Sequence, residues 1–397
     1  MFTHLLDTLK VRLINKLDVV LLGVMSLQED IVEFLKERGV VSYGFATTET
    51  LEGGPPSTDL TYLLPSAKSA ITFTFPLDRD AIKLFISKKS YREHVIDNIE
   101  VNKKAVKTSI ELAEFLRERG YEADIPPAPG KYIGWSQDKE SKAEEIPEDA
   151  QYRQEVKNWR LILPPVLSQR YIAVRSGVAC YGWSGNLGIK GYGANIILGT
   201  TVTSAPLEPT PPLGPEDNFC DDCKLCVSAC ASRMMERDDA TTVTLGGVKF
   251  SYAARKSILR CQMTCGGFSG LDPSGKWSTW SPGRFDVPKE KVEPVEMARL
   301  LGKAFVSSKL RPPITNPDHD VPIRLTCAFC QLICFGNRKE TAENFRMIVN
   351  SGVVIQKEDG ELVVLPPDEG KALFETFDQK HRRHYENRKR KAEKTAT

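Results

Sequence analysis

NFCDDCKLCVSAC at residues 218–230 and CAFCQLIC at residues 327–334 decide the fold of this chain, because they carry seven of its ten cysteines. The first run reads C-x2-C-x2-C-x3-C and the second reads C-x2-C-x3-C. A cubane 4Fe-4S cluster needs four thiolates. A tight loop with these short steps delivers three of them, and the next helical turn carries a fourth to a neighbouring cluster. The spacing therefore predicts two 4Fe-4S clusters.

Two clusters need eight ligands, so the seven cysteines need one more. The stretch ILRCQMTCGG at residues 258–267 offers Cys261, with Cys265 as its substitute. The crossover arrangement of two-cluster ferredoxins assigns the first cluster to Cys220, Cys223, Cys226 and Cys334. It assigns the second to Cys230, Cys261, Cys327 and Cys330. Cys180 and the unused member of the 261/265 pair are expected to be buried as small hydrophobic residues.

Zinc and disulfides are the alternative uses of so many cysteines. Zinc sites usually show two C-x2-C pairs separated by a longer gap, and four cysteines within eleven residues would crowd one tetrahedral ion. Disulfides between cysteines this close are hard to form, and the opening MFTHLLDTLK does not have the pattern of a secretory signal. We therefore expect a reducing, cytoplasmic setting.

Composition indicates a globular protein of two or three domains. The chain has 397 residues, of which 41% are hydrophobic and 27% charged. Its 54 basic and 52 acidic residues nearly balance, so nucleic acid is not expected as a partner, although the tail at 380–394 is basic. The apolar run VVLLGVM at 19–25 is too short to span a membrane.

The first two hundred residues alternate between helical and strand-like patterns. Ser26 and Glu29 form a capping-box pattern before a helix at 29–39, which the strand-like VVSYGFA at 40–46 follows. The strand-like SAITFTF at 69–75 precedes a second amphipathic helix at 110–120. A mixture of helices and strands is therefore expected.

Residues 177–199, GVACYGWSGNLGIKGYGANIILG, contain seven glycines in twenty-three positions. Glycines let backbone amides approach a ligand closely and adopt positive φ, and they also serve tight turns in an irregular loop. Neither a phosphate-binding loop nor a dinucleotide fingerprint is present in this stretch.

This glycine-rich segment leads through SAPLEPTPP at 204–212 directly into the first cysteine run. The block resembles the corrinoid-dependent reductive dehalogenases and epoxyqueuosine reductase, and CAFCQLICFGNRKE at 327–340 is similar to the closing motif of the latter. The resemblance covers about half of the chain. It implies an α+β protein with a nitroreductase-like domain at 1–213 that holds base-off cobalamin. A ferredoxin-like domain at 214–340 with an insertion at 240–326 would follow, and then a C-terminal extension at 341–397.

The resemblance also implies roles for individual residues. By position, the corrinoid would be lined by Gly182, Gly185, Asn186, Gly191 and Gly193. The candidates for supplying a proton are Tyr121, Tyr192 and Lys190, with Tyr181 and Arg175 as further candidates.

The chain departs from the family pattern in places. Ala231 and Phe335 replace the proline that usually follows each cysteine run, and Ile162 stands where epoxyqueuosine reductase carries its proton-donating aspartate. An isoleucine cannot donate a proton, which argues against that activity. Trp277 and Trp280 in the long interval between the runs would either roof a substrate cavity or anchor the insertion as its core.

Together these patterns predict an oxidoreductase that reduces a small molecule through Co(I), with electrons from a low-potential donor such as ferredoxin or flavodoxin. One alternative is an iron-sulfur electron-transfer protein that activates a corrinoid partner. The other is an epoxyqueuosine reductase-like enzyme acting on tRNA. The sequence carries no prediction of oligomeric state.

Overall fold

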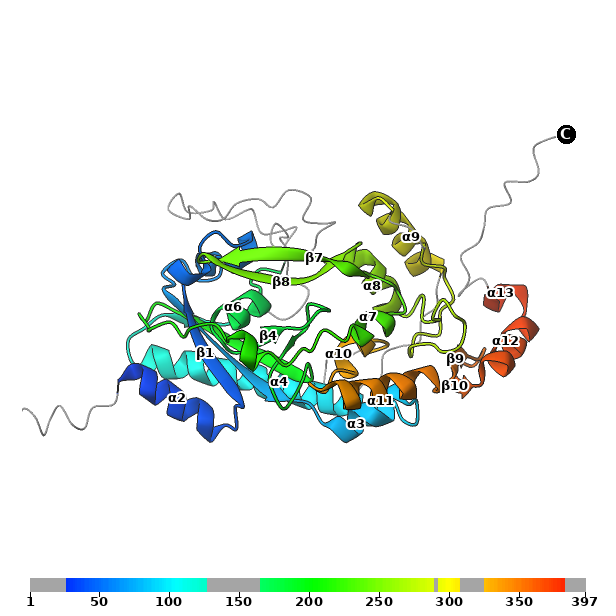
Figure 1. Ribbon diagram of the computed structural model, residues 1–397, viewed down its shortest axis with the longest axis horizontal. Helices are drawn as coiled ribbons and strands as arrows, with labels where there is room; N and C mark the ends of the chain where they lie inside the picture. The colour runs from blue at the N-terminus through cyan, green and yellow to red at the C-terminus, as the bar shows by residue number, and fades with distance from the viewer. Residues whose placement is uncertain (1–25, 127–164, 289–291, 308–324, 383–397) are drawn as a thin grey trace, which may run out of the picture.

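The computed structural model describes residues 26–126, 165–288, 292–307 and 325–382, and it combines helices with small sheets (Figure 1). The expected mixture of helices and strands is confirmed. Ile162, the apolar run at 19–25 and most of the basic tail lie outside the described residues. In the described ranges, none of the helices has both the length and the apolar run needed to cross a membrane.

The largest sheet is antiparallel, with strand order β1-β2-β6-β3. Its strands are β1 (Ser42–Thr47), β2 (Ser69–Pro76), β6 (Ile196–Thr203) and β3 (Ala123–Asp124). Along β2, Phe73 and Phe75 alternate with Thr72 and Thr74, and all four are buried. Gly199 on β6 leaves room for Phe73, since a methyl group there would lie 2.4 Å from the ring. The sheet is therefore covered on both faces.

Helices on the two faces form separate cores. On one face, α2 (Leu27–Glu37) and α4 (Arg92–Glu118) place Leu35, Leu112 and Leu116 against the phenylalanines of β2. On the other, α6 (Gln169–Arg175) packs Ile172 against Val202 of β6. The capping box at Ser26 is confirmed, because its hydroxyl accepts from the Glu29 amide at 3.3 Å. Short 3-10 turns occur at Glu49–Leu51, Pro56–Thr58, Leu60–Tyr62 and Pro215–Asp217.

The cysteine runs lie in the second half of the chain, on short elements. A small hairpin, β4 (Cys180–Tyr181) and β5 (Leu187–Gly188), comes before the first run, which ends in α7 (Leu225–Ser228). A long hairpin, β7 (Met235–Leu245) and β8 (Val248–Arg255), then packs on β4, and Figure 1 shows it running across α6. The remaining helices are α3 (Arg79–Ile86), α8 (Ile258–Cys265), α9 (Pro294–Ser307), α10 (Phe329–Leu332), α11 (Arg338–Val349), α12 (Pro367–Thr376) and α13 (Gln379–Arg382). Strands β9 (Val353–Gln356) and β10 (Leu362–Leu365) pair antiparallel.

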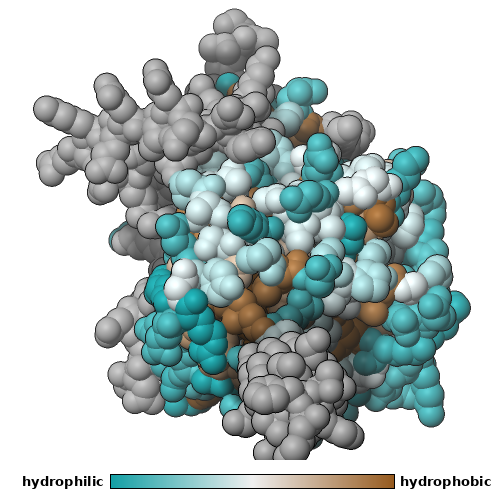
Figure 2. Space-filling model, turned by 90° about the vertical axis from the view of Figure 1, so that its left-hand side faces the viewer, coloured by the Kyte–Doolittle hydropathy of each residue, from teal (hydrophilic) through white to brown (hydrophobic). Residues whose placement is uncertain are grey.

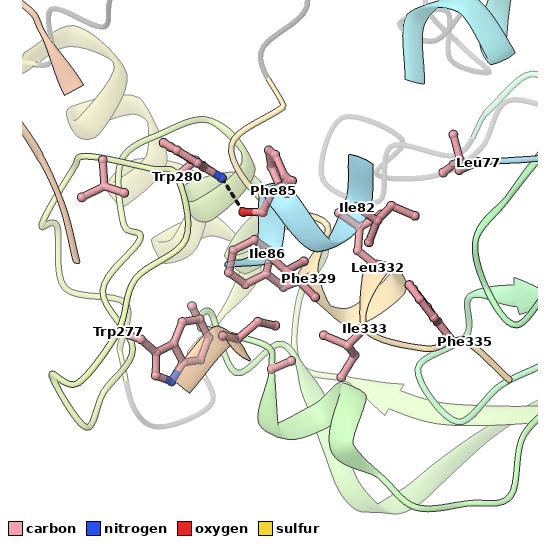
Figure 3. Close-up of a cluster of buried hydrophobic side chains, with 14 residues drawn as sticks. Leu77, Ile82, Phe85, Ile86, Trp277, Trp280, Phe329, Leu332, Ile333 and Phe335 are labelled. Atoms are coloured by element: carbon pink, nitrogen blue, oxygen red, sulfur yellow. Dashed lines mark hydrogen bonds between the residues drawn. The ribbon is translucent and has the colours of Figure 1, made fainter. Parts of the chain in front are cut away.

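An aromatic core joins α3 to the second cysteine run (Figure 3). Trp277 stacks on Phe329 of α10 with ring centroids 5.9 Å apart, and Trp280 donates its indole N–H to the Phe85 carbonyl at 2.9 Å. Both tryptophans are almost fully buried. They therefore anchor the insertion as core residues, and the idea that they roof a substrate cavity is wrong.

Most of the surface at the α2 end of the molecule is hydrophilic. Figure 2 shows this end, where a hydrophobic area lies between hydrophilic side chains. The cysteine motifs are not on this surface, since α7 and α10 pack against each other further along the molecule.

Candidate iron-sulfur site

The two cysteine runs share a backbone conformation. Lys224, which follows Cys223, has φ 56° and caps α7, while Ala328, which follows Cys327, has φ 83° and caps α10. Neither is a glycine, so each turn costs backbone free energy that the surrounding contacts must offset. In the first run this turn lies between Cys223 and Cys226, and in the second run it lies between Cys327 and Cys330. The last cysteine of each run follows the short helix.

One group of thiols, called site 1, consists of Cys220, Cys223, Cys226 and Cys334. Burial and then the nearby thiols of the other three raise the pKa of Cys226 to about 12. Burial also raises the pKa of Cys334 to about 11, and Cys220 and Cys223 add to the shift. The last cysteine of the second run therefore lies with the first three of the first run.

Site 1 surrounds a cavity. The four thiols line a small cavity of about 20 Å³ together with Trp183, Ser184 and Phe219. Within the described ranges, no three or more His, Cys, Asp or Glu side chains are arranged to hold a single metal ion. The four thiols of site 1 therefore line a shared cavity and do not converge on the position of one metal ion.

The second group, called site 2, consists of Cys230, Cys261, Cys327 and Cys330. Burial raises the pKa of Cys330 well above its usual range, and the thiols of Cys230, Cys327 and Cys261 contribute. Burial likewise raises the pKa of Cys230, with Cys327 and Cys261 among the further causes. The last cysteine of the first run thus lies with the second run.

Two cysteines remain outside these groups. Cys265 Sγ lies 3.5 Å from Cys261 Sγ, one helical turn along α8, so site 2 has a fifth thiol at its edge. Cys180 is buried against Ala194 and Phe219, and burial raises its pKa to about 11. Its surroundings are those of a small hydrophobic residue.

N–H groups point at the sulfur atoms of both sites. At site 1 the Trp183 amide lies 3.4 Å from Cys220 Sγ. At site 2 the Met234 amide lies 3.4 Å from Cys230 Sγ, and the Asn186 side-chain amide lies 3.5 Å from Cys330 Sγ. Such donors stabilise thiolate-bound clusters, which carry negative charge. The four-thiol groups, the cavity and the donors therefore fit 4Fe-4S clusters.

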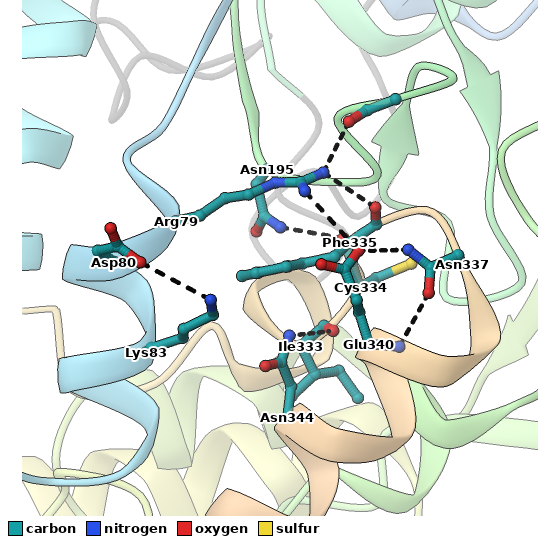
Figure 4. A network of polar contacts seen from close by, with 11 residues as sticks. Arg79, Asp80, Lys83, Asn195, Ile333, Cys334, Phe335, Asn337, Glu340 and Asn344 are labelled. Atoms are coloured by element: carbon teal, nitrogen blue, oxygen red, sulfur yellow. Dashed lines mark hydrogen bonds and ion pairs between the residues drawn. The ribbon is translucent and has the colours of Figure 1, made fainter.

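A polar network fixes the second run (Figure 4). Arg79 of α3 donates to the Phe335 carbonyl at 3.1 Å and to the Gly191 carbonyl at 2.7 Å. Asn195 donates to the Cys334 carbonyl at 3.0 Å, and Asn337 caps α11 by accepting from the Glu340 amide at 2.8 Å. These contacts tie the glycine-rich loop to the residues around Cys334.

The glycine-rich loop packs against the chain itself. A methyl group on Gly193 would lie 2.2 Å from the Cys334 carbonyl oxygen, and one on Gly182 would lie 2.9 Å from the Phe219 ring. One on Gly185 would lie 2.7 Å from Arg255 Nη2. Only Gly191 of the four predicted glycines faces open space.

The packing of the chain itself accounts for three of the four glycines, because an added methyl group on each would meet protein atoms. The Asn186 side chain is directed toward Cys330. A corrinoid lined by these residues stays a prediction.

The three residues predicted to supply a proton lie apart. Tyr121 packs in the core between α4 and the central sheet. Lys190 is exposed and donates to the Glu216 carbonyl at 2.9 Å, and Tyr192 is 37% exposed on the neighbouring turn. The structure does not bring Tyr121 together with the other two.

A different set of polar side chains lies beside site 2, here called the tyrosine-arginine cluster. The hydroxyls of Tyr171 and Tyr252 are 3.2 Å apart, and the rings of Tyr181 and Tyr252 have centroids 4.8 Å apart. Burial raises the pKa of both Tyr171 and Tyr181, so these phenols keep their protons. Arg170 and Arg255 complete the cluster.

Sequence reasoning named Tyr181 as a further candidate and missed the other four. The segments QRYIAVR and FSYAAR each place a tyrosine near an arginine, which is a weak signal. Their meeting depends on the β7–β8 hairpin packing over β4.

No protein-family model and no curated protein matches the sequence. Among solved structures, an epoxyqueuosine reductase from Streptococcus thermophilus is 13% identical, with 91% of this chain and 75% of that chain covered and a TM-score of 0.37. One from Bacillus subtilis is 16% identical, with 62% and 59% covered and a TM-score of 0.35. A reductive dehalogenase whose structure suggests a mechanism for B12-dependent dehalogenation is 11% identical, with 86% and 47% covered and a TM-score of 0.38.

The structural neighbours thus come from the two enzyme groups that the cysteine motifs resemble, at low identity. This chain spans 52% to 59% of the length of three of the epoxyqueuosine reductase structures. One of those was solved with a tRNA stem loop, so the expectation that nucleic acid is not a partner gains no support. These TM-scores are too low to define the fold, which is described above from its own residues.

Proposed function

We propose that this chain is an iron-sulfur oxidoreductase with one 4Fe-4S cluster in site 1 and one in site 2. The observation that carries the proposal is the exchange of cysteines between the two runs. Cys334 lies with the first run and Cys230 with the second, as the crossover in two-cluster ferredoxins requires. When bound, the clusters supply one-electron transfer at low potential.

The proposed domains follow the same division. Residues 1–213 form a nitroreductase-like domain, and 214–340 form a ferredoxin-like domain with its insertion at 240–326. Residues 341–397 are a C-terminal extension. The pairing of the two motif turns, at Lys224 and Ala328, supports the ferredoxin-like assignment.

The residues that surround site 1 differ from those that surround site 2. Site 1 lies next to the exposed residues Asp221 and Asp222, so it would be the cluster nearer the surface and would receive electrons from a donor such as ferredoxin or flavodoxin. Site 2 adjoins the tyrosine-arginine cluster through Asn186 and Cys330. Reduction of a small molecule needs protons as well as electrons, and the half-buried Tyr171 hydroxyl holds one beside site 2.

Metal and sulfide analysis of protein purified without oxygen tests the proposal. We expect about eight irons and eight sulfides per chain, and little zinc. The variants Cys226→Ala and Cys330→Ala should each retain about four irons, whereas Cys180→Ala, the matched control, should retain about eight. Circular dichroism checks that each variant is folded. Zinc in place of iron, or an equal loss in the control, would overturn the assignment.

A second candidate function is electron transfer to a corrinoid partner, without a corrinoid of its own. In favour of this alternative, the packing of the chain itself accounts for Gly182, Gly185 and Gly193 without a bound ligand. The family resemblance favours a resident cobalamin used as Co(I). Cobalt analysis of protein produced with cobalamin supplied separates the two, because only a resident corrinoid would be retained, at about one cobalt per chain.

A further inference from the structure

Three segments of the chain meet beside Cys334 of site 1 (Figure 4). The Ala194 amide of the glycine-rich loop donates to the Cys334 carbonyl at 2.9 Å. Arg79, at the start of α3, donates to the Phe335 carbonyl at 3.1 Å. Asn337, which caps α11, lines the cavity of site 1. The surface over these three segments therefore borders site 1 beside the second cysteine run.

This surface carries exposed basic side chains, and we call it the basic face. Its exposed members are Lys190, Arg338 and Lys339. None of the three forms an ion pair with a carboxylate in the described ranges. Lys190 instead donates to the Glu216 carbonyl at 2.9 Å. The charges of these three side chains are therefore available to a binding partner.

Two further cations lie at the base of the basic face. The Arg79 guanidinium is 4.7 Å from the centroid of the Phe335 ring, and Lys83 Nζ is 5.8 Å from it. Each has an acidic partner, since Glu340 lies 3.7 Å from Arg79 and Asp80 lies 3.7 Å from Lys83. Because Asp80 and Glu340 are held in these ion pairs, they do not cancel the exposed charges of the basic face.

The surface beside the first cysteine run carries the opposite charge. Asp221, Asp222 and Asp238 are exposed there. Lys224 lies 3.8 Å from Asp222 and 3.4 Å from Asp238, so its charge is already compensated. An acidic protein would be repelled by this surface and attracted to the basic face.

Proteins that deliver single electrons meet their partners through small interfaces, and charges steer the encounter. We propose that an acidic electron-carrier protein docks on the basic face and reduces the cluster in site 1. This inference rests on the proposed function, because a cluster in site 1 would accept the electron. One electron passes from the reduced carrier to that cluster, and no covalent bond forms or breaks.

A nucleic acid is the other polyanion that a basic surface can bind. Phosphate binding relies on several neighbouring cations, and the Asp80 carboxylate, on a side chain that is 93% exposed, would repel phosphate beside Lys83. The end of α11 that carries Arg338 and Lys339 also borders site 1. This position favours a partner that exchanges electrons, because electron transfer becomes slow over long distances.

Stopped-flow reduction of the anaerobically purified, iron-loaded protein by reduced plant-type ferredoxin, an acidic carrier, tests the proposal. We expect the second-order rate constant to fall as salt is added, and to fall at least about tenfold in Arg338→Glu/Lys339→Glu. Lys371→Glu/Lys380→Glu, on α12 and α13, is the matched control with the same net charge and should react as the unmodified protein does. An unchanged rate constant in the test variant, or one insensitive to salt, would overturn the proposal.

Two further measurements separate docking from other effects. Reduction by the methyl viologen radical, a small cation that needs no docking surface, should be no slower in the test variant, and iron should stay near about eight per chain. Slower reduction by the radical, or lost iron, would mean that the substitutions disturb the cluster, and would overturn the docking assignment.

Binding of a tRNA stem loop, followed by fluorescence anisotropy, tests the competing partner. The test variant and the control variant should bind it equally. Binding lost only in the test variant, together with an unchanged rate of reduction by ferredoxin, would assign the basic face to nucleic acid. Absence of iron from the unmodified protein would count against the proposed function itself.

Discussion

The side-chain amide of Asn186 lies 3.5 Å from the sulfur of Cys330. This contact joins the glycine-rich loop to site 2, because Asn186 follows Gly185 on the turn between β4 and β5. An amide donor to a ligand sulfur favours the reduced, more negative cluster. The turn therefore places a neutral hydrogen-bond donor beside the proposed electron source.

Replacing Asn186 with Ala should lower the reduction potential of site 2. Loss of one hydrogen bond to a charged sulfur, about 1 kcal/mol, corresponds to roughly 40 mV for a one-electron couple. Redox titration followed by electron paramagnetic resonance measures the shift. Asn102→Ala, on the exposed face of α4, is the control and should leave both potentials in place. An unshifted potential in Asn186→Ala would show that the contact has no electronic effect.

Removing Cys261 and Cys265 one at a time should leave site 2 able to hold its cluster. Their sulfurs are 3.5 Å apart on one face of α8, so either thiol can reach the same iron. We expect about eight irons per chain in each single alanine variant and about four in the double variant. A loss confined to Cys261→Ala would identify Cys261 as the fixed ligand and exclude exchange.

Gly193→Ala should destabilise the protein more than Gly191→Ala does. Both residues have positive φ, which costs an alanine about 1 kcal/mol. At Gly193 the methyl group would also lie 2.2 Å from the Cys334 carbonyl oxygen, whereas at Gly191 it would meet nothing within 4 Å. The free energy of unfolding, from denaturant titration, should fall by at least about 2 kcal/mol for Gly193→Ala. An equal loss of unfolding free energy in the two variants would mean that the loop moves to accommodate the methyl group at Gly193.

Stability should fall in mild acid because of His94. This residue is fully buried against Phe85, neither ring nitrogen has a hydrogen-bond partner in the described residues, and burial lowers its pKa to about 4. The unfolded chain binds the proton near pH 6.5, so His94 favours unfolding progressively as the pH drops from 6.5 toward 4. The full effect is about 3 kcal/mol.

His94→Phe provides the comparison for this prediction. A phenylalanine keeps the contact with Phe85 and cannot take up a proton. The unfolding free energies of the two proteins should therefore diverge between pH 6.5 and pH 5. If the unfolding free energies of the two proteins change in parallel with pH, the acid sensitivity comes from other groups.

Local signals in the sequence predicted the local structure well. The Ser26 capping box, the strand-like run at 40–46 and the alternating run at 69–75 all correspond to observed elements. Helix α4 was predicted only at 110–120, and it begins at Arg92. Its first half buries His94 and Val95 among polar residues, which weakens the apolar periodicity.

Features that depend on distant contacts could not be predicted. Trp277 and Trp280 are core residues because α3 and α10 enclose them. The tyrosine-arginine cluster forms because a long hairpin places Tyr252 and Arg255 over α6 and β4. No periodicity or residue spacing in the sequence predicts this packing between distant segments. The cysteine spacing is the exception, since the ferredoxin pattern specifies which distant residues must meet, and its ligation stays a prediction.

The exchange of cysteines between the two runs also bears on the biosynthesis of the protein. Site 1 needs Cys334 and site 2 needs Cys327 and Cys330, so neither is complete while the ribosome is still translating the insertion. Under the proposed ligation, iron loading would follow synthesis of the second run. A truncated product ending before residue 327 would expose six unpaired thiols, from Cys220 to Cys265, to oxidation and to competing metals.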